Sequence, residues 1–134
     1  MTAFSTRDLA LHALRVASDK GGEDLRLLQL PKGNGVADYV VIATGTSDRQ
    51  VNAIVSEIYS FCKRHKIPNH GVEGESGWFL IDLMDVIVHA FDEEKRTLYD
   101  LDHAYPLALQ VAFEKDLKAL PDPDKTLQSA KRER

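Results

Sequence analysis

Two short runs of the chain, residues 78–82 and 85–91, combine side chains of unusual chemical variety. They hold the single tryptophan, an aspartate each and a histidine, set among β-branched and aromatic residues. Residues of the latter kinds favour strands, and Leu83 and Met84 alone separate the two runs, so the sequence predicts an antiparallel hairpin. The chemistry of this region depends on which of its side chains share a face.

A hairpin that turns on Leu83-Met84 places alternate residues on the same side, because directly opposed residues of antiparallel strands share a face. One side, named the hairpin face here, then carries Trp78, Leu80, Asp82, Asp85, Ile87 and His89. The other side is uniformly apolar and is the better candidate for the core: Phe79, Ile81, Val86, Val88 and Ala90. An aromatic anchor beside aliphatic residues, bordered by charges, is typical of a protein-binding patch.

Two points leave this arrangement open. A helix that covers the hairpin face would bury Trp78 and His89 with internal partners, and the face would then belong to the core. The register is also open, because a type I′ turn requires positive φ, which costs Met84 about 1 kcal/mol.

The same residue types allow a catalytic alternative. Asp82 and Asp85 could hold Mg²⁺, and the amides of Gly45-Thr46-Ser47 precede a predicted helix, where a phosphate can bind. However, no third ligand accompanies the carboxylates, and the segment lacks the further glycines and the lysine of a phosphate-binding loop. The five histidines form no recognisable triad. We therefore expect no metal and no cofactor, and keep a nucleotide-binding or nucleotidyltransferase-like enzyme as the alternative function.

The elements before the hairpin form an α/β pattern. Ser5 begins a helix that ends at Gly21, a Leu-rich strand spans 24–30, and the β-branched run 39–44 is typical of a strand buried on both faces. An extended piece is expected at 69–73. The sequence predicts a single α/β domain with a mixed sheet of about five strands flanked by helices.

A second helix follows Ser47. This residue and Gln50 fit a capping box, in which Ser47 accepts from the amide of Gln50 and the Gln50 side chain reaches back to the amide of Ser47. An apolar stripe at helical spacing follows, and it places the lone cysteine in the core: Val51, Ile54, Val55, Ile58 and Cys62.

The C-terminal part of the chain is less regular in sequence. We expect a turn at 92–95 and a short helix within 97–109, bounded by Pro106. Apolar residues thin out from Glu114 onward, and two prolines at 121 and 123 break any helix. The predicted organisation is a domain over 1–113 and a charged, flexible tail over 114–134.

Charge and composition exclude several classes of protein. The net charge is −4, with +1 in the 114–134 segment and −5 in the residues before it. An acidic body is repelled by phosphate and attracted to basic protein surfaces, which argues against direct DNA binding. A single cysteine argues against a disulfide-rich secreted protein, and no apolar run approaches the ~20 residues of a membrane helix. We expect a cytoplasmic protein.

Motifs over about residues 5–110 resemble, in order and spacing, those of the ribosomal silencing factor family, also called Iojap. They are Ala37-Asp38-Tyr39, Gly45-Thr46-Ser47, Arg49-Gln50-Val51, Ala53-Ile54, Gly71-Val72-Glu73-Gly74, Trp78, Leu80, Asp82, Asp85-Val86, Val88-His89-Ala90-Phe91, Arg96 and Tyr99-Asp100-Leu101. This chain departs from the family near Met84 and near Tyr105, where relatives usually have glycine and tryptophan.

The resemblance implies a translation repressor without enzymatic activity and with a nucleotidyltransferase-like fold. It implies binding to the large ribosomal subunit through ribosomal protein fourteen, which blocks joining of the small subunit by occupancy, and a homodimer in isolation. Most of the hairpin face belongs to the family motifs. Within it we expect Trp78 to be the anchor, Leu80 and Ile87 to extend the apolar patch, and the two aspartates to meet lysine or arginine.

Overall fold

A computed structural model describes residues 4–75, 77–98 and 104–123 of the chain. Its helices are α1 (Thr6–Asp19), α2 (Asp48–Arg64), α3 (Glu93–Leu98) and α5 (Glu114–Ala119). Its strands are β1 (Glu23–Gln29), β2 (Tyr39–Gly45), β3 (Val72–Glu75), β4 (Trp78–Asp82), β5 (Val86–Asp92) and β6 (Leu109–Gln110). These strands form one mixed sheet in the order β3-β4-β5-β2-β1-β6, so the described residues hold six strands rather than about five.

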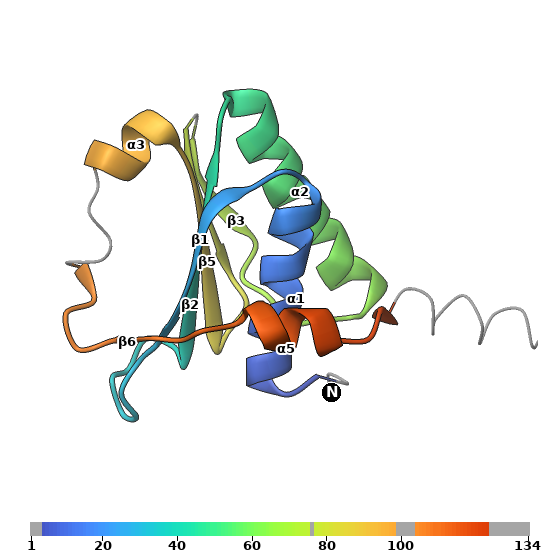
Figure 1. Cartoon of the computed structure of the whole chain (residues 1–134), viewed down its shortest axis with the longest axis vertical. Coiled ribbons are helices and arrows are strands. Elements are labelled where there is room, and N and C mark those ends of the chain that lie inside the picture. The colour runs from blue at the N-terminus through green and yellow to red at the C-terminus, as the bar shows by residue number, and fades with distance from the viewer. Residues whose placement is uncertain (1–3, 76, 99–103, 124–134) are drawn as a thin grey trace, which may run out of the picture.

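The helices and the sheet form two layers. Figure 1 shows the sheet close to edge-on, with α1 and α2 on one side and α3 on the other. The predicted stripe of α2 is buried against the sheet, as is the apolar side of the β4–β5 hairpin, including Ile81 and Val88. The apolar positions of the sequence therefore build the main core, as predicted. No helix among the described residues is long and apolar enough to cross a membrane.

The central strand is β2. It pairs in parallel with β5 over seven residue pairs and antiparallel with β1 on its other side. Its residues Val40 to Ala43 have no exposed surface, which confirms the prediction of a strand buried on both faces.

A second, smaller apolar cluster lies on the side of the sheet away from α1 and α2. Its buried members come from β1, β2, β5 and the loop before β2, and they are Leu28, Leu30, Ala37, Val40, Ile42 and Phe91. Trp78, Ile87, Tyr105 and Ala108 pack against it while staying partly exposed. The hairpin face is thus partly covered by Tyr105 and Ala108, which follow α3 in the chain.

Side-chain caps begin both long helices. Ser5 Oγ accepts from the amide of Asp8, and Ser47 Oγ accepts from the amide of Gln50, each at 3.1 Å. The second half of the predicted capping box is wrong. The Gln50 side chain accepts from the amide of Thr46 at 2.6 Å and donates to the carbonyl of Gly21, so it ties α2 to the turn after α1.

The hairpin register differs from the prediction by two residues. Trp78 lies opposite Phe91 and Asp82 opposite Ile87, so the turn centres on Met84-Asp85 rather than on Leu83-Met84. Asp85 therefore does not oppose Asp82. Met84 has φ +72°, and the Asp82 side chain accepts from its amide at 2.9 Å.

The C-terminal part forms more structure than the sequence indicates. The expected turn at 92–95 is instead the start of α3, where Asp92 accepts from the amide of Lys95. Of the helix expected within 97–109, Thr97 and Leu98 end α3, residues 99–103 lie outside the described residues, and Leu109 begins β6. The extended piece expected at 69–73 lies slightly later, as β3.

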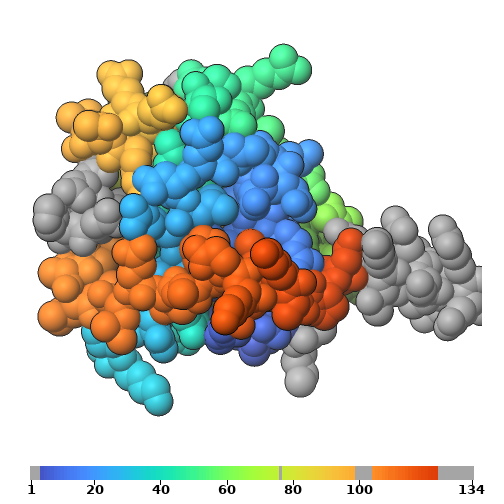
Figure 2. All heavy atoms as spheres, viewed as in Figure 1, coloured from blue at the N-terminus to red at the C-terminus, as the bar shows by residue number. Residues whose placement is uncertain are grey.

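The helix α5 occupies the start of the expected tail. Arg15 of α1 donates to the carbonyls of Leu117 and Leu120, while Arg7 pairs with Asp116. The segment that includes β6 and α5 crosses one side of the molecule as a continuous band (Figure 2). Irregular chain was expected at Glu114–Ala119 and is not found there. Residues 124–134 lie outside the described residues, so the division into domain and tail stays a prediction.

Met84 offers a direct test of backbone strain. Side chains with a Cβ are disfavoured at positive φ, whereas glycine is not. We expect Met84→Gly to have a free energy of unfolding about 1 kcal/mol above that of Met84→Ala, because both remove the side chain and only glycine relieves the strain. Urea denaturation of the two variants checks this, and equal midpoints would show that the turn is unstrained.

Candidate functional site

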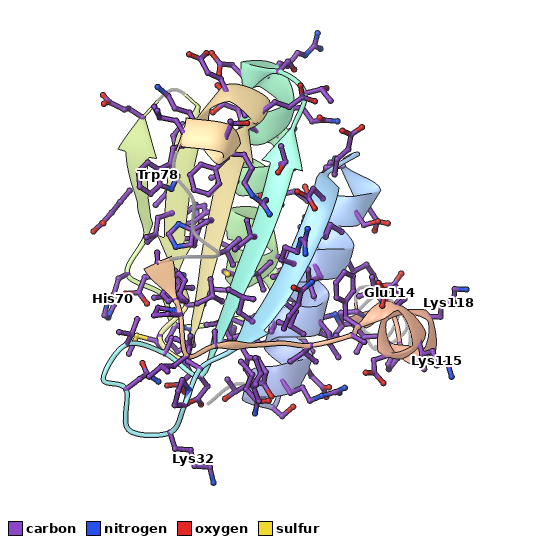
Figure 3. The ribbon with its side chains drawn as sticks, turned by 60° about the vertical axis from the view of Figure 1, so that its left-hand side comes forward. Lys32, His70, Trp78, Glu114, Lys115 and Lys118 are labelled. Atoms are coloured by element: carbon purple, nitrogen blue, oxygen red, sulfur yellow. The ribbon has the colours of Figure 1, made fainter. Side chains whose placement is uncertain are left out.

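The hairpin face lies on the side of the sheet opposite α1 and α2, and Figure 3 turns this side forward. Because the register shift is two residues, the same alternate residues of β4 and β5 still face this way. Trp78, Leu80, Asp82, Ile87 and His89 share the face, and Asp85 lies in the turn at its end. The structure therefore places five of the six predicted residues on one face of the sheet, with His89 buried beneath its surface, and places the sixth beside them.

Trp78 is held by its strand neighbours. It follows Gly77, which has φ +89° and whose carbonyl accepts from the amide of Asp92. The indole stacks on Phe91, with ring centroids 5.0 Å apart and planes 26° from parallel. Its Nε1–H donates to Nδ1 of His89 at 3.2 Å. The ring is thus fixed in orientation while part of its surface stays exposed, as suits an anchor residue.

His89 lies beneath this surface and is 3% exposed. Since Nδ1 accepts from Trp78, the proton of the neutral ring lies on Nε2, which donates to the Tyr105 hydroxyl at 3.3 Å. Burial lowers the pKa of His89 to about 4 and raises the pKa of Tyr105. A neutral, buried His89 positions Trp78 and Tyr105, and it is not available as a surface contact.

The two aspartates differ in their surroundings. Asp82 is partly buried and its carboxylate lies 3.2 Å from Nδ1 of His70, whose side chain is 62% exposed. Asp85 is exposed, and its carbonyl accepts from the amides of Asp38 and Tyr39, which ties the turn to the start of β2. Both carboxylates lie at the same end of the hairpin.

Sequence reasoning missed two further acidic residues of this surface. Glu73 lies directly opposite Leu80, and Glu75 directly opposite Trp78, so both share the face with their partners. Both are exposed on the edge strand β3. The alternation of glutamates around Gly74 was the available signal, but a run without apolar alternation does not predict which side it presents.

The result is an apolar centre with carboxylates on two of its sides. Trp78, Leu80 and Ile87 are partly exposed on this face, with Leu80 between the other two. Glu73 and Glu75 lie along the strand edge and the aspartates lie at the turn. Such an arrangement can bind a basic protein surface that presents an apolar patch.

The catalytic alternative does not form one site. Gly45 pairs with Asp92 at one end of β5, whereas Asp85 lies before its other end, roughly 20 Å away at strand spacing. The Thr46 amide is already bound to Gln50. Within the described ranges, no three histidine, cysteine, aspartate or glutamate side chains are grouped as metal ligands.

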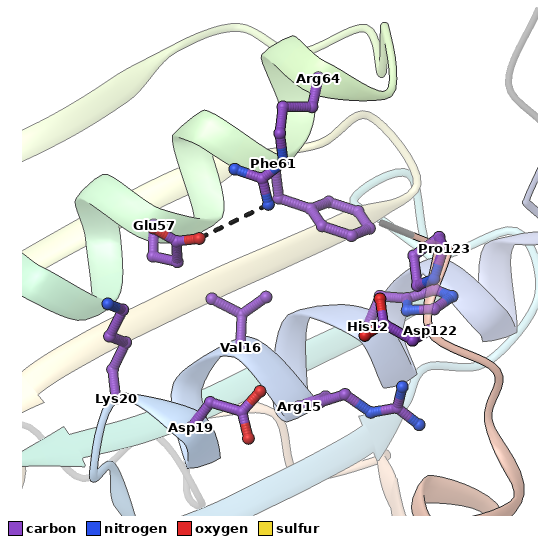
Figure 4. A pocket seen from close by; sticks show the side chains of 10 residues that line it. All are labelled: His12, Arg15, Val16, Asp19, Lys20, Glu57, Phe61, Arg64, Asp122 and Pro123. Atoms are coloured by element: carbon purple, nitrogen blue, oxygen red, sulfur yellow. Dashed lines mark hydrogen bonds and ion pairs between the residues drawn. The ribbon is translucent and has the colours of Figure 1, made fainter. Parts of the chain in front are cut away.

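A separate hollow of about 290 Å³ lies between α1 and α2 (Figure 4). Its charged lining is balanced, with Arg15, Lys20 and Arg64 against Asp19, Glu57 and Asp122. Arg64 pairs with Glu57 at 3.5 Å, and Arg15 is bound to carbonyls near α5. This hollow presents no concentrated charge for a ligand.

Buried histidines predict how stability depends on pH. Burial, with Arg15 nearby, also lowers the pKa of His12 to about 4. In the unfolded chain these rings take up a proton near pH 6.5, whereas in the folded chain they stay neutral until about pH 4. The free energy of unfolding is therefore highest above pH 6.5 and decreases as the pH falls toward 4, by up to about 3 kcal/mol per ring. We expect the variant His12→Phe, whose ring can stack on Phe4 and Phe61, to lose roughly half as much stability as the wild type does between pH 6.5 and 5, because one of the two buried histidines is gone. Urea denaturation across this range checks it, and an unchanged slope would contradict it.

Comparison with known proteins identifies the family. The sequence profile described as "Ribosomal silencing factor during starvation" matches residues 3–134. The ribosomal silencing factor RsfS of Bacillus subtilis is 39% identical over 101 residues, covering 72% of this chain and 86% of the relative. RsfS of Halalkalibacterium halodurans is 32% identical over 113 residues, covering 83% and 97%. A crystal structure of a Chromobacterium violaceum protein superposes with a TM-score of 0.73 at 27% identity, covering 77% and 88%. The chain belongs to the ribosomal silencing factor family.

Proposed function

We propose that this protein binds the large ribosomal subunit through ribosomal protein fourteen and thereby prevents the small subunit from joining. The contact is made by the hairpin face, and the action takes place in the cytoplasm. The observation that carries the proposal is the apolar centre of Trp78, Leu80 and Ile87 bordered by carboxylates. Ribosomal proteins are generally basic because they neutralise RNA, so this border complements them in charge.

Occupancy alone accounts for silencing by a protein of this size. A compact domain of 134 residues has a radius of gyration of about 14 Å, far larger than the separation of two surfaces in contact. A domain bound close to the joining surface therefore blocks joining without any chemical step.

The apolar centre is also the surface through which we propose that two copies form a homodimer in isolation.

Trp78 is the residue whose loss should weaken binding most. We expect Trp78→Ala to lower affinity for the large subunit by about thirtyfold, equivalent to ~2 kcal/mol, because a partly exposed aromatic held on its neighbours is typical of a hot spot. Affinity is measured by co-sedimentation with purified large subunits, and joining by light scattering after small subunits are added.

Two controls make this test specific. Trp78→Phe keeps a ring to stack on Phe91 and should retain most of the affinity. Leu109→Ala removes an equally apolar side chain, 67% exposed, from the opposite edge of the sheet and should bind as the wild type does. Wild-type affinity in a folded Trp78→Ala variant would reject the hairpin face, and normal joining while the protein is bound would reject steric occlusion.

The glutamates of β3 should act mainly on the rate of association. We expect Glu73→Lys combined with Glu75→Lys to slow association with the large subunit severalfold at low salt, with the difference shrinking as salt is added. Glu23→Lys, an exposed single charge reversal on β1, is the control to which each of the two substitutions is compared separately before they are combined. Stopped-flow binding at several ionic strengths checks this, and equal rates for all of these proteins would show that the acidic border does not steer the partner.

A further inference from the structure

The tip of the β4–β5 hairpin carries an exposed apolar side chain on a strained backbone. Met84 has φ +72° and is 47% exposed, so burial of its side chain does not compensate for an unfavourable conformation. Two residues of the turn region, Asp82 and Asp85, are acidic. The turn requires positive φ at this position, and glycine would adopt it without strain, so the presence of a methionine side chain there is a reason to look for a role in recognition.

A groove of about 290 Å³ lies beside this tip, between the start of α1, the chain that follows α2 and the hairpin turn. Six of its eight lining residues are apolar by type, although polar and apolar atoms contribute about equally to the lining surface: Phe4, Thr6, Leu9, Ile67, Pro68, Leu83, Met84 and Asp85. The volume is about twice that of the ~150 Å³ cavity that accommodates a benzene ring, so an aliphatic side chain fits it. Methionine suits such a site because its flexible thioether adapts to the shape of what binds.

Charge and position indicate what this groove receives. Asp85 supplies the charge of the lining, and no lysine or arginine is among the described residues that line it. Asp85 also lies in the turn at the end of the hairpin face, so this one carboxylate borders both the hairpin face and the groove on the α1 side. A basic protein that covers the hairpin face can therefore reach the groove without moving the domain.

We propose that Met84 and this groove form a second contact for the same ribosomal protein and receive an aliphatic side chain that neighbours a lysine or arginine of that partner. The inference rests on the proposed function, since it extends the same surface.

The test separates stability from binding. Met84→Gly relieves the strain but removes the side chain, so we expect a variant at least as stable as the wild type that binds large subunits five- to tenfold more weakly. Met84→Leu keeps an apolar side chain and should bind within twofold of the wild type. Thr6→Phe, which fills the groove from α1, should weaken binding as Met84→Gly does. Thermal denaturation and co-sedimentation of each variant provide the two readouts.

The outcomes distinguish this inference from the function on which it rests. Wild-type affinity of Met84→Gly alongside weakened Trp78→Ala would overturn the groove and leave the hairpin face intact. Wild-type affinity of both variants would overturn the proposed function itself. If Met84→Gly weakens self-association but not ribosome binding, the groove belongs to a second copy of the chain, and the proposal is wrong. A Met84→Leu variant as weak as Met84→Gly would overturn the role of apolar contact.

Discussion

The parallel pairing of β2 with β5 is the constraint on which the rest of the structure depends. A strand buried on both faces tolerates no polar side chain without a partner, and β2 meets this with apolar residues over its central part. Its neighbour β5 is then fixed along seven pairs, which determines the side that His89 and Phe91 take. Because β4 pairs with β5, the same constraint sets the orientation of Trp78. The proposed binding surface is therefore an extension of the core rather than a separate loop structure.

The buried side chain of His89 shows how a polar residue can orient the residues of an apolar surface. His89 satisfies both ring nitrogens, one with the Trp78 indole and one with the Tyr105 hydroxyl. This neutral bridge joins β4 to the chain that follows α3. Trp78 and Tyr105, which belong to these two parts, also both pack against the second apolar cluster. Phenylalanine at this position would fill a similar space but leave the indole N–H without its acceptor. The role of the histidine is thus directional, since it orients the anchor instead of contacting a partner.

Sequence reasoning succeeded where local pattern and core burial agree, as in α1, α2, β2 and the apolar side of the hairpin. It also assigned the strand residues of both hairpin faces correctly despite a wrong turn, because a slip of two residues preserves the alternation, and only Asp85 moved from the face into the turn. It failed where contacts between residues far apart in the sequence determine whether a helix forms or which side a residue faces. The helix α5 is short and rich in charge, and it is held by Arg7 and Arg15, more than 100 residues earlier. The glutamates of β3 acquire a side only through pairing with β4. Conversely, the sequence predicted backbone strain at Met84 correctly, although it placed the centre of the turn at Leu83-Met84 instead of Met84-Asp85.

The contacts between α1 and α5 also bear on how the chain is made. Arg7 precedes its partner Asp116 by 109 positions, and Arg15 precedes the carbonyls of Leu117 and Leu120 by more than 100. At a synthesis rate of about 5–20 residues per second, the first helix exists on the order of 5 to 20 s before the last one emerges. Through that interval the two arginines have no helix to bind, while the sheet residues between them are already available to pair. Closure of α5 over α1 is therefore a late step in the folding of this domain during biosynthesis, because it must wait until residues 114–119 have been synthesised.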